Sequence, residues 1–435
     1  MNGLVKTKMG SVLLGPVTGP GMPTTLRAPQ PDREAAFFLR IASLFAGQSM
    51  SGLPVAKKRK VWSRAAITFG RQVPVASVVE RRFMGPGGAI TLRIYTPEGP
   101  SEQRPAFLWY HGGGFVLGDL DSNDSICRSV ARSSGAVVVA VRYRLAPEYS
   151  LYAGREDCLA ALHWVAANGP SIGVDPTRLA IGGDSAGGNL ASAVAQENIR
   201  RIGPKVSLQV LVYPATDLVA EFPSKQENAH GYMLTAEELD SLPAVIDRGE
   251  DFADPWLSPG RSPDLHGLPP AVVLSAGFDP IRDDGLAYAM QLRAAGVPVE
   301  LLHYPGQFHG FLNFDALMGA ARDAQKRIGV SLARVFRQEP APDCSVEITD
   351  RNVEGGPLSL KRSTEILTAV YMLTRSTRQV SSLAARRLSP KAANAAEFLL
   401  RPWWIPAAMV RRGLRVYLNA PTARQTYSHS PGIRS

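Results

Sequence analysis

The chain has 435 residues, of which 45% are hydrophobic, so it can bury the core of one large domain with extensions or of two domains. Its net charge is +10, and residues 339–435 contribute fourteen Lys and Arg against seven Asp and Glu, a net of +7. Three scattered cysteines exclude a disulfide framework and a thiolate metal site, and the absence of a run of about 20 apolar residues excludes a predicted membrane span.

The N-terminal part is predicted to be partly helical. Residues 1 to about 30 are rich in Gly and Pro and predict a loose segment. Apolar residues at helical spacing predict a helix over 31–48. We interpret the basic run "AKKRK" (56–60) as a solvated loop, and the poor N-terminal signal peptide favours a cytoplasmic protein. Residues 1–75 are therefore expected to form a loose N-terminus and cap helices.

From residue 77 onward, predicted strands alternate with predicted helices. The strands are a hairpin of 77–83 and 89–97 around "GPGG", followed by 106–110, 136–143, 178–183, 207–214, 271–277 and 297–304. The helices are 121–134, 155–167, 186–200, 284–295 and 315–337. This alternation predicts a mostly parallel sheet flanked by helices over 76–337. The irregular stretch at about 217–255, with one helix in "TAEELDSLPAVI", is interpreted as a cap insertion.

A candidate nucleophile lies between the strand 178–183 and the helix that follows it. Residues 183–187 read Gly-Asp-Ser-Ala-Gly, a G-x-S-x-G pattern at the point where a nucleophile elbow must lie. Such an elbow presents the Ser185 hydroxyl at the carboxyl edge of the sheet, beside a positive helix N-terminus. The sequence therefore predicts Ser185 as the nucleophile of an acyl transfer.

A serine nucleophile needs a base to take its proton, and on this kind of fold the chain order is Ser, then Asp or Glu, then His. Asp279 follows the strand 271–277, and His309 lies in the loop after the next strand. Asp283 and Asp284 are better interpreted as first-turn acids of a helix, and His303 lies inside a strand pattern. We predict that His309 is the general base and that Asp279 orients it.

The stretch "HGGG" (111–114) follows the buried strand 106–110. Glycines allow the backbone N–H groups to approach a ligand closely, and acyl transfer needs such donors for its oxyanion. We predict an oxyanion hole made of the N–H groups of Gly113, Gly114 and Ala186. His111 is interpreted as a buried residue that organises the loop.

Five stretches together resemble the hormone-sensitive-lipase-like family of α/β-hydrolases, of the bacterial esterase and arylacetamide-deacetylase type. They are "HGGGF", "YRLAPE" (143–148), "GGDSAGGNLA", "DPIRDDG" and "HGF", within about residues 78–333. The resemblance implies an α/β-hydrolase fold, a helical cap, hydrolysis of short- to medium-chain carboxylesters without cofactor or metal, and often dimers formed through sheet edges. "SLYAG" (150–154) departs from the family's usual "FPA", and the family usually ends near residue 337.

Residues 338–435 are predicted to form a basic, partly helical C-terminal extension. Trp403 and Trp404 stand among apolar residues and arginines, a pattern typical of a helix on an anionic membrane surface. Packing on the hydrolase body or on a second subunit, and a partner-binding tail, are alternative interpretations. Nucleic acid is not an expected partner, because the arginines are spread and no binding module is present.

The main hypothesis is thus a serine carboxylesterase or lipase-like enzyme that acts on small-molecule esters through an acyl-enzyme. An amidase or an acyltransferase would use the same three residues, so both remain alternatives. A hydrolase-fold ligand-binding protein is a third, although such receptors typically lack one catalytic residue. The protein is expected in the cytoplasm, with or without peripheral membrane contact.

Overall fold

A computed structural model describes residues 12–13, 17, 19–45, 52–100 and 103–349. Most of the predicted C-terminal extension, residues 350–435 with both of its tryptophans, lies outside the described residues. Within the described ranges, no helix is both long and apolar enough to cross a membrane.

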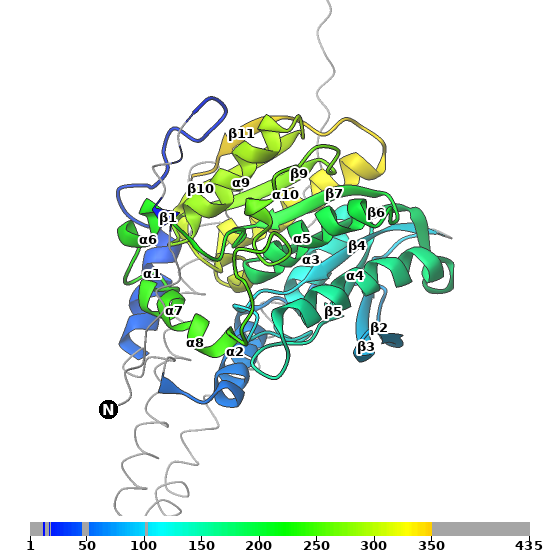
Figure 1. The fold of residues 1–435 in the computed structure, drawn as a ribbon, viewed down its shortest axis with the longest axis horizontal. Coiled ribbons are helices and arrows are strands. Elements are labelled where there is room, and N and C mark those ends of the chain that lie inside the picture. The colour runs from blue at the N-terminus through cyan, green and yellow to red at the C-terminus, as the bar shows by residue number, and fades with distance from the viewer. Residues whose placement is uncertain (1–11, 14–16, 18, 46–51, 101–102, 350–435) are drawn as a thin grey trace, which may run out of the picture. The chain divides into compact units, whose positions relative to one another are not determined.

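The described residues form a mixed sheet of nine strands in the order β11-β10-β9-β7-β6-β4-β5-β3-β2 (Figure 1). Pairing is antiparallel only between β2 and β3 and between β3 and β5. The strands are β2 Ser77–Gly85, β3 Gly88–Thr96, β4 Arg104–Tyr110, β5 Val137–Arg142, β6 Val174–Asp184, β7 Val206–Val212, β9 Ala271–Phe278, β10 Val299–Phe308 and β11 Cys344–Glu347. Two short strands, β1 Val12–Leu13 and β8 Ala220–Glu221, pair separately.

Five helices flank the sheet (Figure 1): α3 Asp124–Ser134, α4 Leu151–Asn168, α5 Ala186–Arg200, α9 Arg282–Ala294 and α10 Gly319–Phe336. Helix α3 packs against α10, and α4 packs against α5. Every residue of β9 and most of β5 are buried, which agrees with their mainly apolar sequences without polar alternation. The predicted mostly parallel sheet flanked by helices is confirmed.

The cap elements are α1 Arg33–Phe45, α2 Val55–Phe69, α6 Pro223–Glu227, α7 Ala236–Ser241 and α8 Pro243–Ile246. The interpretation of "AKKRK" as a loop is wrong, because these residues lie in α2, which buries Ala66 and Phe69. The helix predicted in the insertion is two short helices instead. Pro243 lacks the N–H that would continue α7, and it opens α8.

The sheet continues past the position where the family resemblance ends it. Strand β11, Cys344–Glu347, pairs in parallel with β10 and covers its outer edge. The described start of the predicted extension is therefore part of the sheet. Short-range periodicity does not reveal a four-residue strand whose partner lies about forty residues earlier.

The N-terminal segment, residues 19–32, lies mostly in the stretch to about residue 30 that is predicted to be loose, but it contacts β10 and β11. The Thr24 N–H and hydroxyl donate to Glu347 Oε1, both at 2.6 Å. The backbone carbonyls of Thr25 and Leu26 lie 3.0 and 2.9 Å from His303 Nε2. This segment thus ties the start of the chain to the half of the sheet that carries β10 and β11.

Candidate active site

Three predicted site residues follow three parallel strands at the same edge of the sheet. Ser185 follows β6, Asp279 follows β9 and His309 follows β10. Strand β4 also ends at this edge and leads into the glycine loop at residues 111–114. The carboxyl edge of a parallel sheet is where open α/β folds place their sites, and here it brings together residues up to 124 positions apart.

The turn between β6 and α5 holds Ser185 in a strained conformation. Its φ of 57° and ψ of −119° are unfavourable for a residue with a side chain. The Ser185 N–H donates to the Val212 carbonyl of the neighbouring strand at 2.8 Å, which holds the turn against the sheet. Gly187 must be glycine, because a Cβ there would lie 1.9 Å from the carbonyl oxygen of Tyr110.

His309 lies between the other two side chains. Its Nδ1 is 2.7 Å from Asp279 Oδ2, and its Nε2 is 2.9 Å from Ser185 Oγ. With the Nδ1 proton directed at the carboxylate, the Nε2 lone pair faces the serine hydroxyl. The centre of the Tyr213 ring lies 4.8 Å from the centre of the imidazole, and this packing limits the rotation of His309. His309 can therefore take a proton from the serine hydroxyl and donate it to another group.

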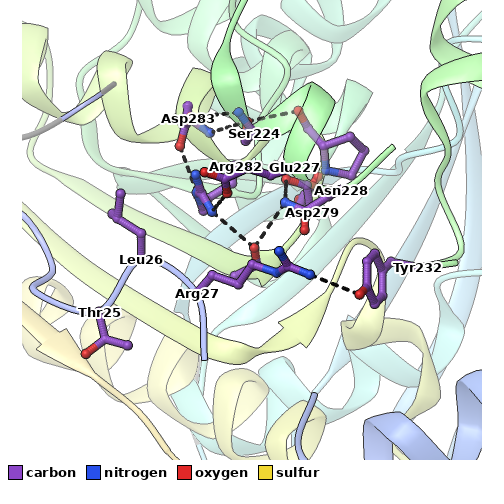
Figure 2. A network of polar contacts seen from close by, with 12 residues as sticks. Thr25, Leu26, Arg27, Ser224, Glu227, Asn228, Tyr232, Asp279, Arg282 and Asp283 are labelled. Atoms are coloured by element: carbon purple, nitrogen blue, oxygen red, sulfur yellow. Dashed lines mark hydrogen bonds and ion pairs between the residues drawn. The ribbon is translucent and has the colours of Figure 1, made fainter. Parts of the chain in front are cut away.

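Asp279 is fully buried, so its carboxylate is held by neighbouring donors rather than by water. The Ile281 N–H donates to Oδ1 at 2.8 Å, which leaves Oδ2 for the imidazole. The backbone carbonyl of Asp279 accepts a hydrogen bond from Asn228 at 3.0 Å (Figure 2). Asn228 belongs to the insertion, and sequence reasoning missed it because its contact lies 51 residues away.

The glycine loop is anchored to the elbow. The Gly112 N–H donates to Asp184 Oδ1 at 2.8 Å, and burial raises the pKa of Asp184 to about 6. Gly113 has a φ of +121°, a conformation that favours glycine. Within the described residues, no protein atom accepts a hydrogen bond from the N–H groups of Gly113, Gly114 and Ala186. These donors are therefore free to bind an oxygen atom of a ligand.

His111 is buried and stacks on Tyr143 with ring centroids 4.4 Å apart. Its backbone carbonyl accepts a hydrogen bond from the Tyr143 hydroxyl at 2.6 Å. Burial lowers the pKa of His111 to about 4, so the ring is neutral at physiological pH. These contacts support the view that His111 organises the loop.

The three rival residues hydrogen-bond to other groups. His303 is buried and contacts the Ser275 hydroxyl and the N-terminal segment. Asp283 and Asp284 lie in the first turn of α9, as predicted, but their carboxylates also bind backbone N–H groups of Ser224 and Thr216 at 3.0 and 2.8 Å. None of the three contacts the serine hydroxyl.

A cavity of about 330 Å³ opens onto Ser185 and His309. Its walls are mainly apolar and come from the cap as well as from the glycine loop, with Trp62 on α2, Leu239 on α7 and Leu242 between α7 and α8. Sequence reasoning missed Trp62 because the run of four basic residues at 57–60 hides the apolar spacing of α2. In the described part of the chain, no group of three or more His, Cys, Asp or Glu side chains is arranged to hold a metal ion.

The chain is similar to a known fold family and to named esterases. A family model described as the alpha/beta hydrolase fold matches residues 107–313. Esterase LipI of Mycobacterium tuberculosis is 41% identical over 267 residues, which cover 60% of this chain and 83% of the relative. Carboxylesterase NlhH of the same organism is 42% identical over 265 residues, which cover 59% and 83%.

Solved structures agree with these relatives. A hyperthermophilic esterase from the archaeon Pyrobaculum calidifontis is 36% identical and matches 72% of this chain and 98% of its own, with a TM-score of 0.65. A thermostable esterase from Pseudomonas putida is 32% identical and matches 71% and 98%, with a TM-score of 0.68. The chain belongs to the bacterial, hormone-sensitive-lipase-like esterases of the α/β-hydrolase fold, and it is an ester hydrolase.

Proposed function

We propose that this ester hydrolase is a serine carboxylesterase in which Ser185 is the nucleophile, His309 the general base and acid, and Asp279 the group that orients the imidazole. The observation that carries the proposal is the continuous chain of hydrogen bonds, 2.9 Å from serine to histidine and 2.7 Å from histidine to aspartate, at the end of an apolar cavity.

In the acylation step, Ser185 Oγ attacks the ester carbonyl carbon while its proton passes to His309 Nε2. The carbonyl oxygen becomes an oxyanion, which accepts hydrogen bonds from the N–H groups of Gly113, Gly114 and Ala186. When the intermediate collapses, the bond to the alcohol oxygen breaks and His309 gives that oxygen its proton. The products are an alcohol and an acyl-serine.

In the deacylation step, a water molecule replaces the alcohol. His309 takes a proton from the water as its oxygen attacks the acyl carbon, and the same donors stabilise the second oxyanion. The acyl–serine bond then breaks, and the proton returns to Ser185 Oγ. The carboxylic acid leaves and the enzyme is restored.

The size and lining of the cavity support small esters with short to medium acyl chains as substrates. A volume of about 330 Å³ is at the lower end of the range of small-molecule sites. Leu242 lies over the glycine loop, about 3.5 Å from the place where a Gly114 Cβ would be. An acyl chain would thus pack between the loop and the cap, where its apolar surface is removed from water.

Hydrolysis of p-nitrophenyl esters from two to sixteen carbons tests this proposal. We expect turnover by the wild type with a short- or medium-chain optimum, and loss of turnover in Ser185→Ala that retains the wild-type circular dichroism spectrum. Unchanged turnover in the folded variant would exclude Ser185 as the nucleophile. Turnover of amides in preference to the matched esters would favour the amidase alternative.

Membrane contact through the C-terminal extension, residues 338–435, and formation of a homodimer stay predictions. A chain that lacks most of the extension tests the membrane contact. Because β11 belongs to the sheet, this truncated chain should end at Thr349 rather than at Arg337. Sedimentation with anionic vesicles should be lost in the truncated chain, and light scattering of the full chain reports its oligomeric state.

A further inference from the structure

The strands that lead to Asp279 and His309, β9 and β10, are neighbours, but their pairing is interrupted just before these two residues. Strand β10 pairs with β9 up to Tyr304 and again at Phe308, so residues 305–307 oppose Gly277 alone. Gly277 has no room for a side chain, because a Cβ would lie 2.1 Å from the carbonyl oxygen of Pro305. Such a bulge re-aims the residues that follow it and leaves backbone groups without partners in the sheet.

On the β9 side, the insertion supplies hydrogen bonds that the ladder lacks, beside a longer one of 3.4 Å from Arg282 Nη1 to the Gly277 carbonyl. Asn228 is completely buried just after α6. Its Nδ2 donates to the carbonyl oxygen of Gly277 at 3.2 Å and to that of Asp279 at 3.0 Å. One amide thus bridges the bulge and the backbone of Asp279 (Figure 2).

On the β10 side, the N-terminal segment supplies the partners. The Ala28 N–H donates to the Pro305 carbonyl, and the Asp32 N–H donates to the Gly306 carbonyl, both at 2.9 Å. The Asp32 side chain accepts a hydrogen bond from Gln307 Nε2 at 2.7 Å. All three bulge residues are therefore held by a segment outside the sheet, just before the proposed base.

Arg27 joins the two sides. Its guanidinium lies 4.5 Å from the centre of the Phe278 ring, at the end of β9. It also donates to the Tyr232 hydroxyl at 3.0 Å, on the insertion (Figure 2). The N-terminal segment, the insertion and the end of β9 thus contact one another beside the bulge.

We propose that Asn228 and Asp32 are positioning residues that hold this bulge and so fix the 2.7 Å separation of His309 and Asp279. The proposal rests on the catalytic roles proposed above for His309 and Asp279. Neither Asn228 nor Asp32 is among the described residues that line the cavity, so their loss should lower kcat and leave KM unchanged. A misplacement of about 1 Å at a catalytic group costs about 10²-fold in rate.

The test compares Asn228→Ala with Asn198→Ala. Asn198 is also buried and donates to a backbone carbonyl, that of Pro204 at 2.8 Å, but it lies at the far end of α5. We expect Asn228→Ala to lower kcat about 10²-fold and to shift the low-field proton NMR signal of His309 Nδ1. Asn198→Ala should lower the unfolding midpoint but leave kcat and the signal at wild-type values.

A second pair of variants guards against a failure of Asn228→Ala to fold. Asp32→Ala should lower kcat and shift the NMR signal, whereas Asp32→Asn keeps an oxygen acceptor for Gln307 and should restore both. Wild-type kcat and an unshifted signal in a folded Asn228→Ala or Asp32→Ala variant would overturn the proposal, as would an equal loss of kcat in Asn198→Ala. The NMR signal reports the histidine–aspartate geometry without turnover, so it separates this result from a failure of the esterase mechanism.

Discussion

Gly112 and Asp184 join the glycine loop to the nucleophile turn through one hydrogen bond, from the Gly112 N–H to Asp184 Oδ1 at 2.8 Å. The two residues are 72 positions apart, and both are buried. This contact sets the position of the free N–H groups of Gly113 and Gly114 relative to the Ser185 hydroxyl. It therefore connects the proposed oxyanion hole to the proposed nucleophile.

Removal of the Asp184 acceptor should impair catalysis more than substrate binding. In Asp184→Ala, the glycine loop loses its anchor, and we expect kcat to fall about 10²-fold. Asp184→Asn keeps an oxygen acceptor and should lose less. Steady-state kinetics on one short-chain ester measure both variants, and wild-type kcat in Asp184→Ala would contradict the anchoring role.

The same carboxyl predicts a pH effect. Since burial raises the pKa of Asp184 to about 6, the wild type holds a charged acceptor at pH 8 and mostly a neutral carboxyl at pH 5. The Asn side chain is neutral throughout. The ratio of wild-type to Asp184→Asn kcat should therefore fall as the pH is lowered from 8 to 5, and a constant ratio would argue against this titration.

The nucleophile turn should not tolerate a methyl group at Gly187. A Cβ there would lie 1.9 Å from the Tyr110 carbonyl, so the backbone itself must move. We expect Gly187→Ala to lower the free energy of unfolding by more than about 4 kcal/mol, or to prevent soluble expression. Gly52→Ala is the matched control, because no atom lies within 4 Å of its added Cβ.

His303 should make the protein less stable in acid. Burial lowers the pKa of His303 to about 4, so between about pH 6.5 and 4 the unfolded chain binds a proton that the folded chain does not. Stability from this group is present above pH 6.5 and is lost as the pH falls, by about 2 kcal/mol at pH 5. The stability difference between wild type and His303→Gln in urea should shrink from pH 7.5 to pH 5.

Thr235 should contribute to substrate binding through the cap. Its hydroxyl accepts a hydrogen bond from the Glu238 N–H at 3.2 Å, and Glu238 Oε2 accepts one from the Thr235 N–H at 3.0 Å, a capping box at the start of α7. Thr235→Ala should destabilise α7 by about 1 kcal/mol and raise KM with little change in kcat. Thr235→Ser keeps the acceptor and should behave like the wild type in the same assay.

Features that repeat over short distances could be predicted from the sequence. The valine-rich run at 137–141 and the mostly apolar run at 271–276 give strands, and α5 begins at Ala186 as predicted. The predicted site residues meet because each directly follows a strand, and parallel strands share their carboxyl edge. Local pattern and the topology of a parallel sheet were sufficient for this part of the molecule.

Features that depend on distant partners could not be predicted. Asn228, Asp32 and β11 carry no local signal of their contacts with the ends of β9 and β10. Helix α2 escaped prediction because a run of four basic residues, 57–60, hides its apolar spacing. Such contacts become visible only when the sheet has brought remote segments together.

The most direct test of Ser185 as the nucleophile is to label the active enzyme with a p-nitrophenyl alkylphosphonate. Mass spectrometry of its peptides then identifies the modified residue. We predict one covalent adduct, on Ser185, with loss of ester hydrolysis in proportion to labelling. Loss of activity with the adduct on another residue, or full activity after complete labelling of Ser185, would contradict this prediction.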